Sequence, residues 1–494
     1  MTDFITFEER SMKLARYLLA VAAGWLLGGA VASPALAAEG KPEEVIIVCK
    51  THFDIGYTDL ARNVVQRYRT SMIDNALRIV DQSRQLPPEQ RFVWTLSGWP
   101  MQQVLWSGQE PERRKRVAEA IREGRLVWHA LPASLHTESL DLEDLVRGMD
   151  FSSALSRQFD MPLPRDAKMT DVPSHTWVLP TILKRSGVDF LHIGCNAGSG
   201  SPELPAIFWW EGPDGSRLLT MYSPNYGTGL HPPADWPHKT WLALIHTGDN
   251  HGPPTPDEIK RLLEQAHREL PGVKIRMGRL SDFGDAILRE KPSLPVVRAD
   301  LSDTWIHGVM SMPIETRLAR NLRPAIAAYD TLNTLLSAWG VDVRPCREAV
   351  AAAYEGSLMY GEHTWGYDAK QFPRLYGKAW QEAEAAGRYK RLEESWGEKA
   401  AYVTKPAGRI LPAMAQDLER LAKAVKVDGP RIVVFNPLPW PRDGLVTLDL
   451  DGEPPRWLPT RLKDVVSGKH VACERVGNKA MFVARQVPPL GYRT

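Results

Sequence analysis

From residue 44 to residue 290 the sequence alternates short apolar runs with longer segments in which apolar residues recur every three or four positions. The first run, EVIIVCK at 44–50, is rich in β-branched residues and predicts a buried strand, and the segment 57–82 predicts the helix after it. Strands that alternate with helices indicate parallel βαβ units. The expected fold class is therefore α/β, with a sheet or barrel whose chemistry lies at the carboxyl ends of its strands.

Two changes of pattern divide the rest of the chain. Three long segments rich in Ala, Leu, Arg and Glu have a helical period, and they lie at 315–340, 342–358 and 373–396. Beyond Gly429, three apolar runs separated by Pro and Gly turns predict strands, at 431–436, 445–450 and 479–486. The sequence therefore predicts a (β/α) domain at 43–300, a helical bundle domain at 301–425 and a partial β domain at 429–494.

The N-terminal segment predicts export. Residues 12–38 read MKLARYLLAVAAGWLLGGAVASPALAA, with a positively charged start, an apolar stretch and then the small-x-small form of a cleavage site. The apolar stretch is short for a membrane anchor. We therefore expect a signal peptide at 1–37 and a mature protein that is periplasmic or secreted, with no membrane partner after cleavage.

Composition limits the classes of partner. Lys and Arg number 61 and Asp and Glu number 59, which gives a net charge of +2. A nucleic-acid-binding protein carries a strongly basic face, so this near-balance argues against a nucleic-acid partner. The four cysteines are too scattered for a CxxC zinc site or a disulfide scaffold. The sequence leaves the oligomeric state open.

His52 and Asp54 give the first chemical signal. They stand two residues apart at the carboxyl end of the first predicted strand, and side chains at that spacing in extended chain point to the same side. An imidazole and a carboxylate aimed together suit a zinc ion, which takes nitrogen and oxygen ligands at about 2.0–2.2 Å. A hydrogen-bonded His–Asp pair without a metal is the alternative.

Four further segments carry residues that could do chemistry. Asp171 stands where the fourth predicted strand ends, although an aspartate there can also form a turn or cap a helix. Asp249 and His251 belong to a Gly- and Pro-rich loop predicted at 247–254. The last two segments are DTWIHG at 303–308 and EHTWG at 362–366.

Five motifs in the same order resemble glycoside hydrolase family 38, the α-mannosidase family. HFDIGY at 52–57 resembles the family's HxDxGW, and DVPSH at 171–175 resembles its D-x-F-G-[HY]. FWWEGPDGS at 208–216 resembles FxWxGxDGS, and the loop at 247–254 resembles GDGGGGP. FNPLPW at 435–440 resembles the motif that opens the family's C-terminal β domain.

The resemblance implies a fold and an activity. It implies a (β/α)7-type barrel, then a three-helix bundle, then the start of an all-β, sandwich-like domain. It also implies a zinc-dependent retaining glycosidase, α-mannosidase-like, whose carbohydrate substrate is an exported or scavenged glycan. Carried over by position, Asp171 is the nucleophile and Asp249 the acid/base. The implied ligands of the zinc ion (Zn2+) are His52, Asp54, Asp171 and His307.

The resemblance also implies substrate contacts. Tyr57 stands where the family has an aromatic floor for the sugar. His363 falls in a segment that resembles the family's HHD stretch, from which Glu362-His363-Thr364 departs. The implied substrate-binding residues are Tyr57, Trp210, His251, His363 and Trp365. In the loop that carries Asp249, Asn250 and His251 replace family glycines.

Two other functions fit parts of the same pattern. A His/Asp metal site on a related barrel supports a metal-dependent polysaccharide deacetylase, in which metal-activated water attacks an amide. That reaction needs no second carboxylate, so activity retained in Asp249→Asn would favour it. The short C-terminal β region fits a non-catalytic sugar-binding protein derived from the enzyme family, which binding without turnover would select.

Overall fold

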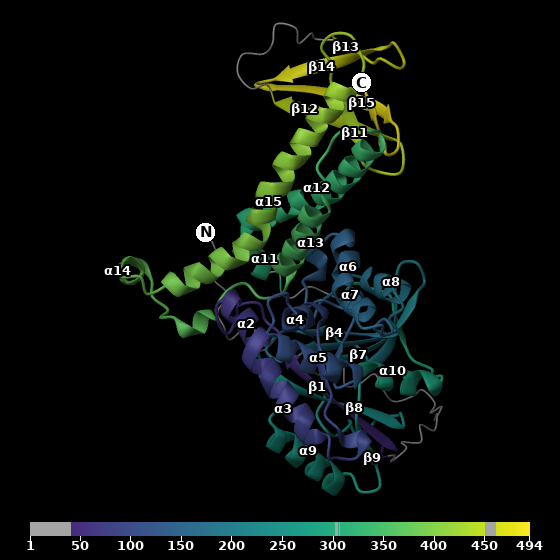
Figure 1. Cartoon of the computed structure of the whole chain (residues 1–494), viewed down its shortest axis with the longest axis vertical. Helices are drawn as coiled ribbons and strands as arrows, with labels where there is room; N and C mark the ends of the chain where they lie inside the picture. The colour runs from purple at the N-terminus through teal and green to yellow at the C-terminus, as the bar shows by residue number, and fades with distance from the viewer. Residues whose placement is uncertain (1–40, 302–304, 306, 450–460) are drawn as a thin grey trace, which may run out of the picture. The chain divides into compact units, whose positions relative to one another are not determined.

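The computed structural model describes residues 41–301, 305, 307–449 and 461–494 (Figure 1). They form a mixed α/β region, a helical region and a C-terminal antiparallel sheet. The predicted signal peptide at 1–37 lies outside the described residues. None of the helices in this part of the chain combines the length and the apolar character needed to cross a membrane.

The first sheet contains the strand that opens the described chain. Its order is β3-β2-β1-β8, β9 also pairs with β1, and every pairing is parallel. The strands are β1 (Glu44–His52), β2 (Trp94–Leu96), β3 (Leu126–Trp128), β8 (Thr240–Asp249) and β9 (Lys274–Met277). Every residue of β1 after Glu44 is buried, as expected for a parallel strand that is covered on both faces.

The second sheet has the order β10-β6-β7-β5-β4. Its strands are β4 (Asp166–Asp171), β5 (Phe190–Cys195), β6 (Ile207–Glu211), β7 (Arg217–Ser223) and β10 (Val296–Val297). All pairings are parallel except that of β6 with β7. The sequence predicts neither β6 nor β8.

Hydrogen bonds join the two sheets at two places. The Ala130 amide, just beyond β3, donates to the Asp166 carbonyl of β4 at 2.9 Å, and the Thr228 amide, in the segment after β7, donates to the Leu244 carbonyl of β8 at 3.2 Å. The strands concerned do not form a continuous ladder between the sheets. Closure into a (β/α)7 barrel therefore stays a prediction.

The helices of the α/β region follow or connect its strands. They are α2 (Ala61–Arg67), α3 (Ile73–Ser83), α4 (Gly98–Val104), α5 (Pro111–Arg122), α6 (Leu142–Gly148), α7 (Asp150–Gln158), α8 (Leu179–Arg185), α9 (Pro256–Glu269) and α10 (Leu280–Arg289). Shorter turns are η1 (Tyr68–Met72), η2 (Pro88–Gln90), η3 (Thr137–Ser139) and, later in the chain, η4 (Ala369–Gln371). The predicted helix at 57–82 begins only at Ala61, since Leu60 has a ψ of 142°, which is extended and not helical.

The helical region consists of α11 (His307–Ser311), α12 (Pro313–Ala338), α13 (Arg347–Gly361), α14 (Gly377–Ala385) and α15 (Lys390–Ala424). Helices α12, α13 and α15 lie side by side (Figure 1) and share a core that includes Leu322, Val350 and Ile410. The helix predicted at 373–396 is wrong. Gly387, with a φ of +73°, separates α14 from α15, and α15 runs on to residue 424.

The C-terminal part is antiparallel. Its larger sheet has the order β12-β15-β14-β13, built from β12 (Arg442–Asp449), β13 (Arg461–Lys463), β14 (His470–Val476) and β15 (Lys479–Val487). A smaller one pairs β11 (Val434–Asn436) with β16 (Gly491–Arg493). The three strands predicted for this part are confirmed, except that residue 450 lies outside the described residues.

One backbone pairing joins the helical region to the α/β region. The segment after α13 runs antiparallel to the segment after β3, with Glu362 opposite Leu135. The His136 amide donates to the Gly361 carbonyl at 2.9 Å, and the His363 amide donates to the Ser134 carbonyl at 3.1 Å. This pairing brings residue 363 to the strand ends of the α/β region.

Candidate metal centre

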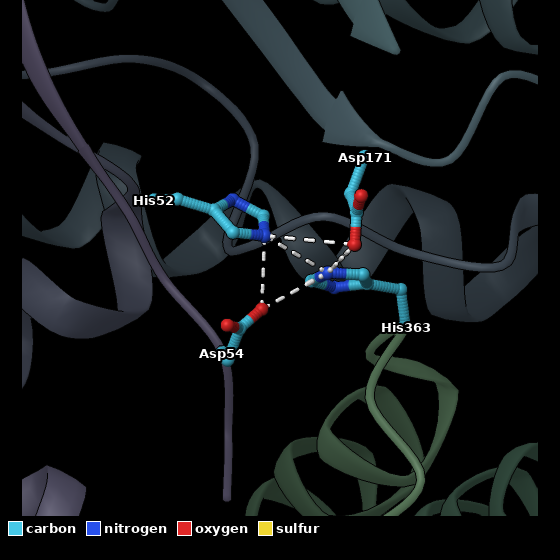
Figure 2. A group of neighbouring side chains, drawn as sticks. All are labelled: His52, Asp54, Asp171 and His363. Carbon is cyan, nitrogen blue, oxygen red and sulfur yellow. Dashed lines mark hydrogen bonds and ion pairs between the residues drawn. The ribbon is translucent and has the colours of Figure 1, made fainter. Parts of the chain in front are cut away.

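Four polar side chains from separate parts of the chain meet in one buried cluster (Figure 2). His52 ends β1 and Asp54 follows it, Asp171 ends β4, and His363 follows α13. One ligand atom of each residue lies within 4.8 Å of the others. We call these four residues the ligand group.

The facing atoms of the ligand group are the Nε2 atoms of both histidines and one oxygen of each aspartate. Asp54 Oδ1 lies 2.9 Å from His52 Nε2 and 3.1 Å from His363 Nε2. Asp171 Oδ2 lies 3.7 Å from His52 Nε2 and 3.2 Å from His363 Nε2. The two nitrogens are 3.2 Å apart. All four side chains therefore point toward one centre, as Figure 2 shows.

These separations fit a metal ion. Ligand atoms about 2.0–2.2 Å from a tetrahedral zinc ion stand roughly 3.3–3.6 Å apart. The five separations that involve a histidine nitrogen, 2.9 to 3.7 Å, span that range, and all four atoms lie within 4.8 Å of one another. Asp54 Oδ1 is buried and accepts no hydrogen bond from the described residues, as expected of an atom that binds an ion. Two imidazole nitrogens and two carboxylate oxygens suit zinc better than calcium, which prefers oxygen ligands alone. The ligand group could therefore hold a metal ion.

Neighbouring charges shift the pKa values of the side chains in the ligand group. Burial opposes a charge on His363, but the carboxylates around it, Glu362 above all, raise its pKa well above the ordinary value. Burial likewise opposes a charge on the two aspartates, yet the histidines lower the pKa of Asp54 to about 2 and hold that of Asp171 far below its usual range. The carboxylates are ionised, and a bound cation would replace protons on the histidines.

Asn250 fixes the backbone that carries His52 and Asp54. Its amide donates to the His52 carbonyl at 2.9 Å, and its side chain both accepts from the Asp54 amide at 3.2 Å and donates to the Asp54 carbonyl at 3.0 Å. These bonds satisfy buried backbone groups where β1 ends. The asparagine that departs from the family's glycine therefore holds the two ligands at the edge of the sheet.

Asp171 is held in a constrained geometry. Its φ of +80° lies in the left-handed region, which is unfavourable for a residue with a side chain. Asp171 Oδ1 accepts hydrogen bonds from the side-chain amide of Asn196, whose Nδ2 is 2.8 Å away, and from the Tyr226 hydroxyl. Because Oδ1 is bound in this way, Oδ2 is the oxygen that faces the histidines of the ligand group.

Asp249 stands next to the ligand group at the end of β8. It pairs with His52 across an irregularity in β1, so the sequence-based loop at 247–254 begins as a strand. Its side chain is half-buried, and burial together with the charges of Asp54 and Asp171 raises its pKa. A raised pKa suits Asp249 to give a proton, and a lowered pKa suits Asp171 to act as an ionised nucleophile.

The predicted substrate-binding residues lie in different places. Tyr57 is half-buried, and its carbonyl accepts the Asp368 amide at 2.9 Å. Trp365 is also half-buried, and its indole contacts His136 Nε2 at 3.0 Å. His251 is exposed in the turn after β8.

Trp210 lies away from these residues, in the hydrophobic core. It has 0% exposure, and its indole Nε1 donates to the Ala299 carbonyl at 3.0 Å. A ring without exposed surface offers no face on which a sugar could stack. The structure therefore corrects its assignment to substrate binding.

The structure describes the side chain of His363 but not that of His307. His307 begins α11, and its side chain lies outside the described part of the chain, so its role as a metal ligand stays a prediction. The structure puts His363, expected to contact substrate, in the ligand group.

Sequence reasoning also missed two partners of Asp171. Asn196 directly follows β5, so the strand-end rule could have found it, whereas Tyr226 lies in a loop and gives no local signal.

Comparison with known proteins connects this geometry to a family. Residues 42–300, more than half of the chain, match the glycosyl hydrolases family 38 N-terminal domain. No curated protein sequence matches the chain.

Two solved structures are similar to the chain. An alpha-mannosidase from Enterococcus faecalis V583 has a TM-score of 0.63 at 16% identity, over 91% of this chain and 55% of that one. A protein in glycosyl hydrolase family 38 from Enterococcus faecalis has a TM-score of 0.58 at 13% identity, over 92% and 53%. The chain thus spans about half the length of each, and at these identities the likeness shows the fold. The match over 42–300 shows that this chain belongs to glycosyl hydrolase family 38.

Proposed function

We propose that this chain is a zinc-dependent retaining glycoside hydrolase that acts on α-mannosides. The observation that carries the proposal is the position of two aspartates at strand ends: Asp171 belongs to the ligand group, and Asp249 pairs with His52 beside it. The histidines lower the pKa of Asp171, and burial with the nearby aspartates raises that of Asp249. Family membership supports glycoside hydrolysis, and the alpha-mannosidase among the similar structures supports an α-mannoside as the substrate.

The proposed reaction has two displacements. Asp171 attacks the anomeric carbon while Asp249 gives its proton to the leaving glycosidic oxygen, so the glycosidic bond breaks and a glycosyl–Asp171 ester forms. Asp249, now a carboxylate, takes a proton from a water molecule whose oxygen attacks the anomeric carbon and releases Asp171. Two inversions at that carbon retain its configuration.

Neighbouring side chains prepare Asp171 for this role. Its Oδ2 faces the ligand group, which leaves Oδ1 for the attack on the sugar. The Asn196 amide and the Tyr226 hydroxyl fix the direction of Oδ1. When bound, zinc would orient sugar hydroxyls and keep the nucleophile ionised. The half-buried rings of Tyr57 and Trp365 are the proposed aromatic contacts for the sugar.

Azide rescue of two alanine variants tests the two roles. We expect Asp249→Ala to lose roughly 10²–10⁴-fold in kcat/KM on α-mannosides with poor leaving groups, and much less on activated aryl α-mannosides that need no acid. Azide should rescue it and give a mannosyl azide of retained configuration. Asp171→Ala should be inactive without azide and give the inverted product with it. The exposed Asp257→Asn is the control and should keep native activity.

Two results would contradict this proposal. Native hydrolytic activity of Asp249→Asn on glycans without an activated leaving group would favour the metal-dependent polysaccharide deacetylase, and acetate release would then be measured. Mannoside binding without turnover in the metal-loaded native chain would favour a sugar-binding protein derived from the family.

Location and domain organisation complete the proposal. We propose that residues 1–37 are a signal peptide, that 43–300 is a catalytic barrel domain of the (β/α)7 type, and that a bundle at 301–425 and a partial β domain at 429–494 follow. N-terminal sequencing of protein from the periplasm or medium tests export. A start at residue 38 is expected, and an intact N-terminus confined to the cytoplasm would contradict it.

A further inference from the structure

Glu362 lies directly behind one histidine of the ligand group. Its side chain is fully buried, and its Oε1 atom lies 2.7 Å from His363 Nδ1, on the side of the ring away from the ligand group. The two atoms meet as an ion pair rather than as an aligned hydrogen bond. Neither atom has a hydrogen-bond partner among the described residues, so this ion pair is the polar contact that orients the ring.

A carboxylate at this position selects the form of the histidine. A neutral imidazole carries one proton, on Nδ1 or on Nε2. The negative charge of Glu362 favours the proton on Nδ1, which leaves the lone pair of Nε2 facing Asp54 and Asp171. Carboxylates behind metal-bound histidines act in this way and raise the basicity of the ligand.

The other oxygen of Glu362 is held separately. Oε2 accepts the Thr364 amide at 3.0 Å and the Thr364 hydroxyl at 2.5 Å. These two bonds fix the carboxylate plane and direct Oε1 toward the histidine. The Glu-His-Thr order thus orients His363 through its two neighbours in the chain.

Lys399 of α15 gives this buried carboxylate a counter-charge. Its side chain is 2% exposed, and Nζ lies 3.9 Å from Glu362 Oε2. Nζ also donates to the Met359 carbonyl at 3.0 Å and to the Glu362 carbonyl at 2.8 Å, at the end of α13. A cation at a helix carboxyl end satisfies carbonyls that have no partner within the helix. The ammonium also lies 4.8 Å from the centre of the Trp365 ring.

We propose that Glu362 and Lys399 are positioning residues of the metal centre. Glu362 favours the proton on Nδ1 and sets the direction of the His363 ring, and Lys399 holds the Glu362 carboxylate in place. The contacts from His363 to Glu362 and from Glu362 to Lys399 thereby connect the ligand group to α15 of the helical region. This inference rests on the metal centre of the proposed function, and it assigns a role to two residues that touch neither metal nor substrate.

Metal affinity tests this proposal without any substrate. The metal-free full chain is titrated with Co²⁺ and Zn²⁺ in competition with a chelator, and the visible spectrum of the Co²⁺ form is recorded. Because loss of such an outer partner weakens metal binding roughly 10–100-fold, we expect Glu362→Gln to bind Zn²⁺ at least about tenfold more weakly, with a shifted Co²⁺ spectrum. Lys399→Met should weaken binding in the same direction, and Lys399→Arg should restore part of the loss.

Controls separate positioning from folding. Glu355→Gln changes a glutamate within α13 and should leave metal affinity unchanged. Glu355 accepts a hydrogen bond from the Trp99 indole at 2.8 Å. Thermal unfolding of each metal-free variant identifies those that fail to fold. A folded Glu362→Gln variant with native affinity and a native Co²⁺ spectrum would overturn this inference and leave the proposed function intact. A native chain that binds no metal would overturn both.

Discussion

The α/β region and the helical region contribute to the ligand group in different ways. His52, Asp54 and Asp171 stand at or just beyond the ends of β1 and β4, where a parallel sheet gathers the carboxyl ends of its strands. His363 is 311 residues from His52 and reaches it through contacts between the regions, among them the pairing of the segment after α13 with the segment after β3. Local patterns can predict the first three positions, whereas the fourth depends on contacts between regions.

This difference has an energetic consequence. A cation held by ligands from both regions binds only when they are packed together, so metal binding stabilises that packing. Direct contacts between the regions must in turn keep the ligands close before the ion arrives. Substitutions at those contacts should therefore lower the stability of the chain more than substitutions within one region.

The largest effect on stability is expected at the buried ion pair between α6 and α12. Arg323 Nε lies 2.9 Å from Asp144 Oδ2, the two side chains are 3% and 0% exposed, and Arg323 also bonds Ser357 and the Ser139 carbonyl. Replacing one partner of a buried pair leaves an unpaired charge, so Arg323→Met should lower the free energy of unfolding by about 3–5 kcal/mol. Urea unfolding of the metal-free chain measures this change.

An exposed ion pair gives the matched control. Arg185 and Asp214 are 2.9 Å apart, but the arginine side chain is 71% exposed. Arg185→Met should change the unfolding free energy by no more than about 1 kcal/mol. Equal effects of the two substitutions would show that the contact between the regions has no special role in stability.

A smaller, pH-dependent effect on stability is expected at Asp166, which begins β4. Asp166 accepts the Ser281 amide at 2.7 Å, and burial raises its pKa to about 6. Because the folded pKa lies above the unfolded value of about 3.9, protonated Asp166 stabilises the fold at low pH, and this contribution is lost as the pH rises from about 4 through 6. Asp166→Asn should remove a fall on the order of 2 kcal/mol in unfolding free energy over that window.

Unfolding curves of the native chain and Asp166→Asn at several pH values measure the difference between them. Asp171, at the opposite end of the same strand, has its pKa shifted the other way by the histidines, so the native curve alone combines opposing contributions. A difference between the two proteins that stays constant from pH 4 to 7 would contradict this account of Asp166.

The fold was predictable wherever the local pattern was clear. β1 follows from its apolar run, β4 lies where the alternation of strands and helices predicts a strand at 167–171, and both ends of α12 lie close to the predicted segment. β8 reads TWLALIHTGD, in which Thr, Trp and Ile favour a strand but Leu and Ala suit a helix equally, and its end resembles a loop. Its pairing with β1 therefore had to decide its conformation. The break at Gly387 gave no signal, since glycine within a helical pattern is often tolerated.

The site shows the same division. His52, Asp54, Asp171 and Asp249 were found because they lie at strand ends or in recognisable motifs. The place of His363 in the ligand group, and the hydrogen bonds from Asn196 and Tyr226 to Asp171, depend on residues far apart in the chain. Glycine, histidine and glutamate next to one another after α13 indicate chemistry, but no spacing rule says which of them faces an ion.

The central claim is that one metal ion is bound by ligands from both regions, with His363 as the ligand from the helical region. Zinc content per chain, measured by elemental analysis on residues 38–494, tests it directly in native protein, His363→Ala and His307→Ala. We predict one zinc per chain in the native protein, loss in His363→Ala and retention in His307→Ala. Retention in folded His363→Ala with loss in His307→Ala would contradict the account.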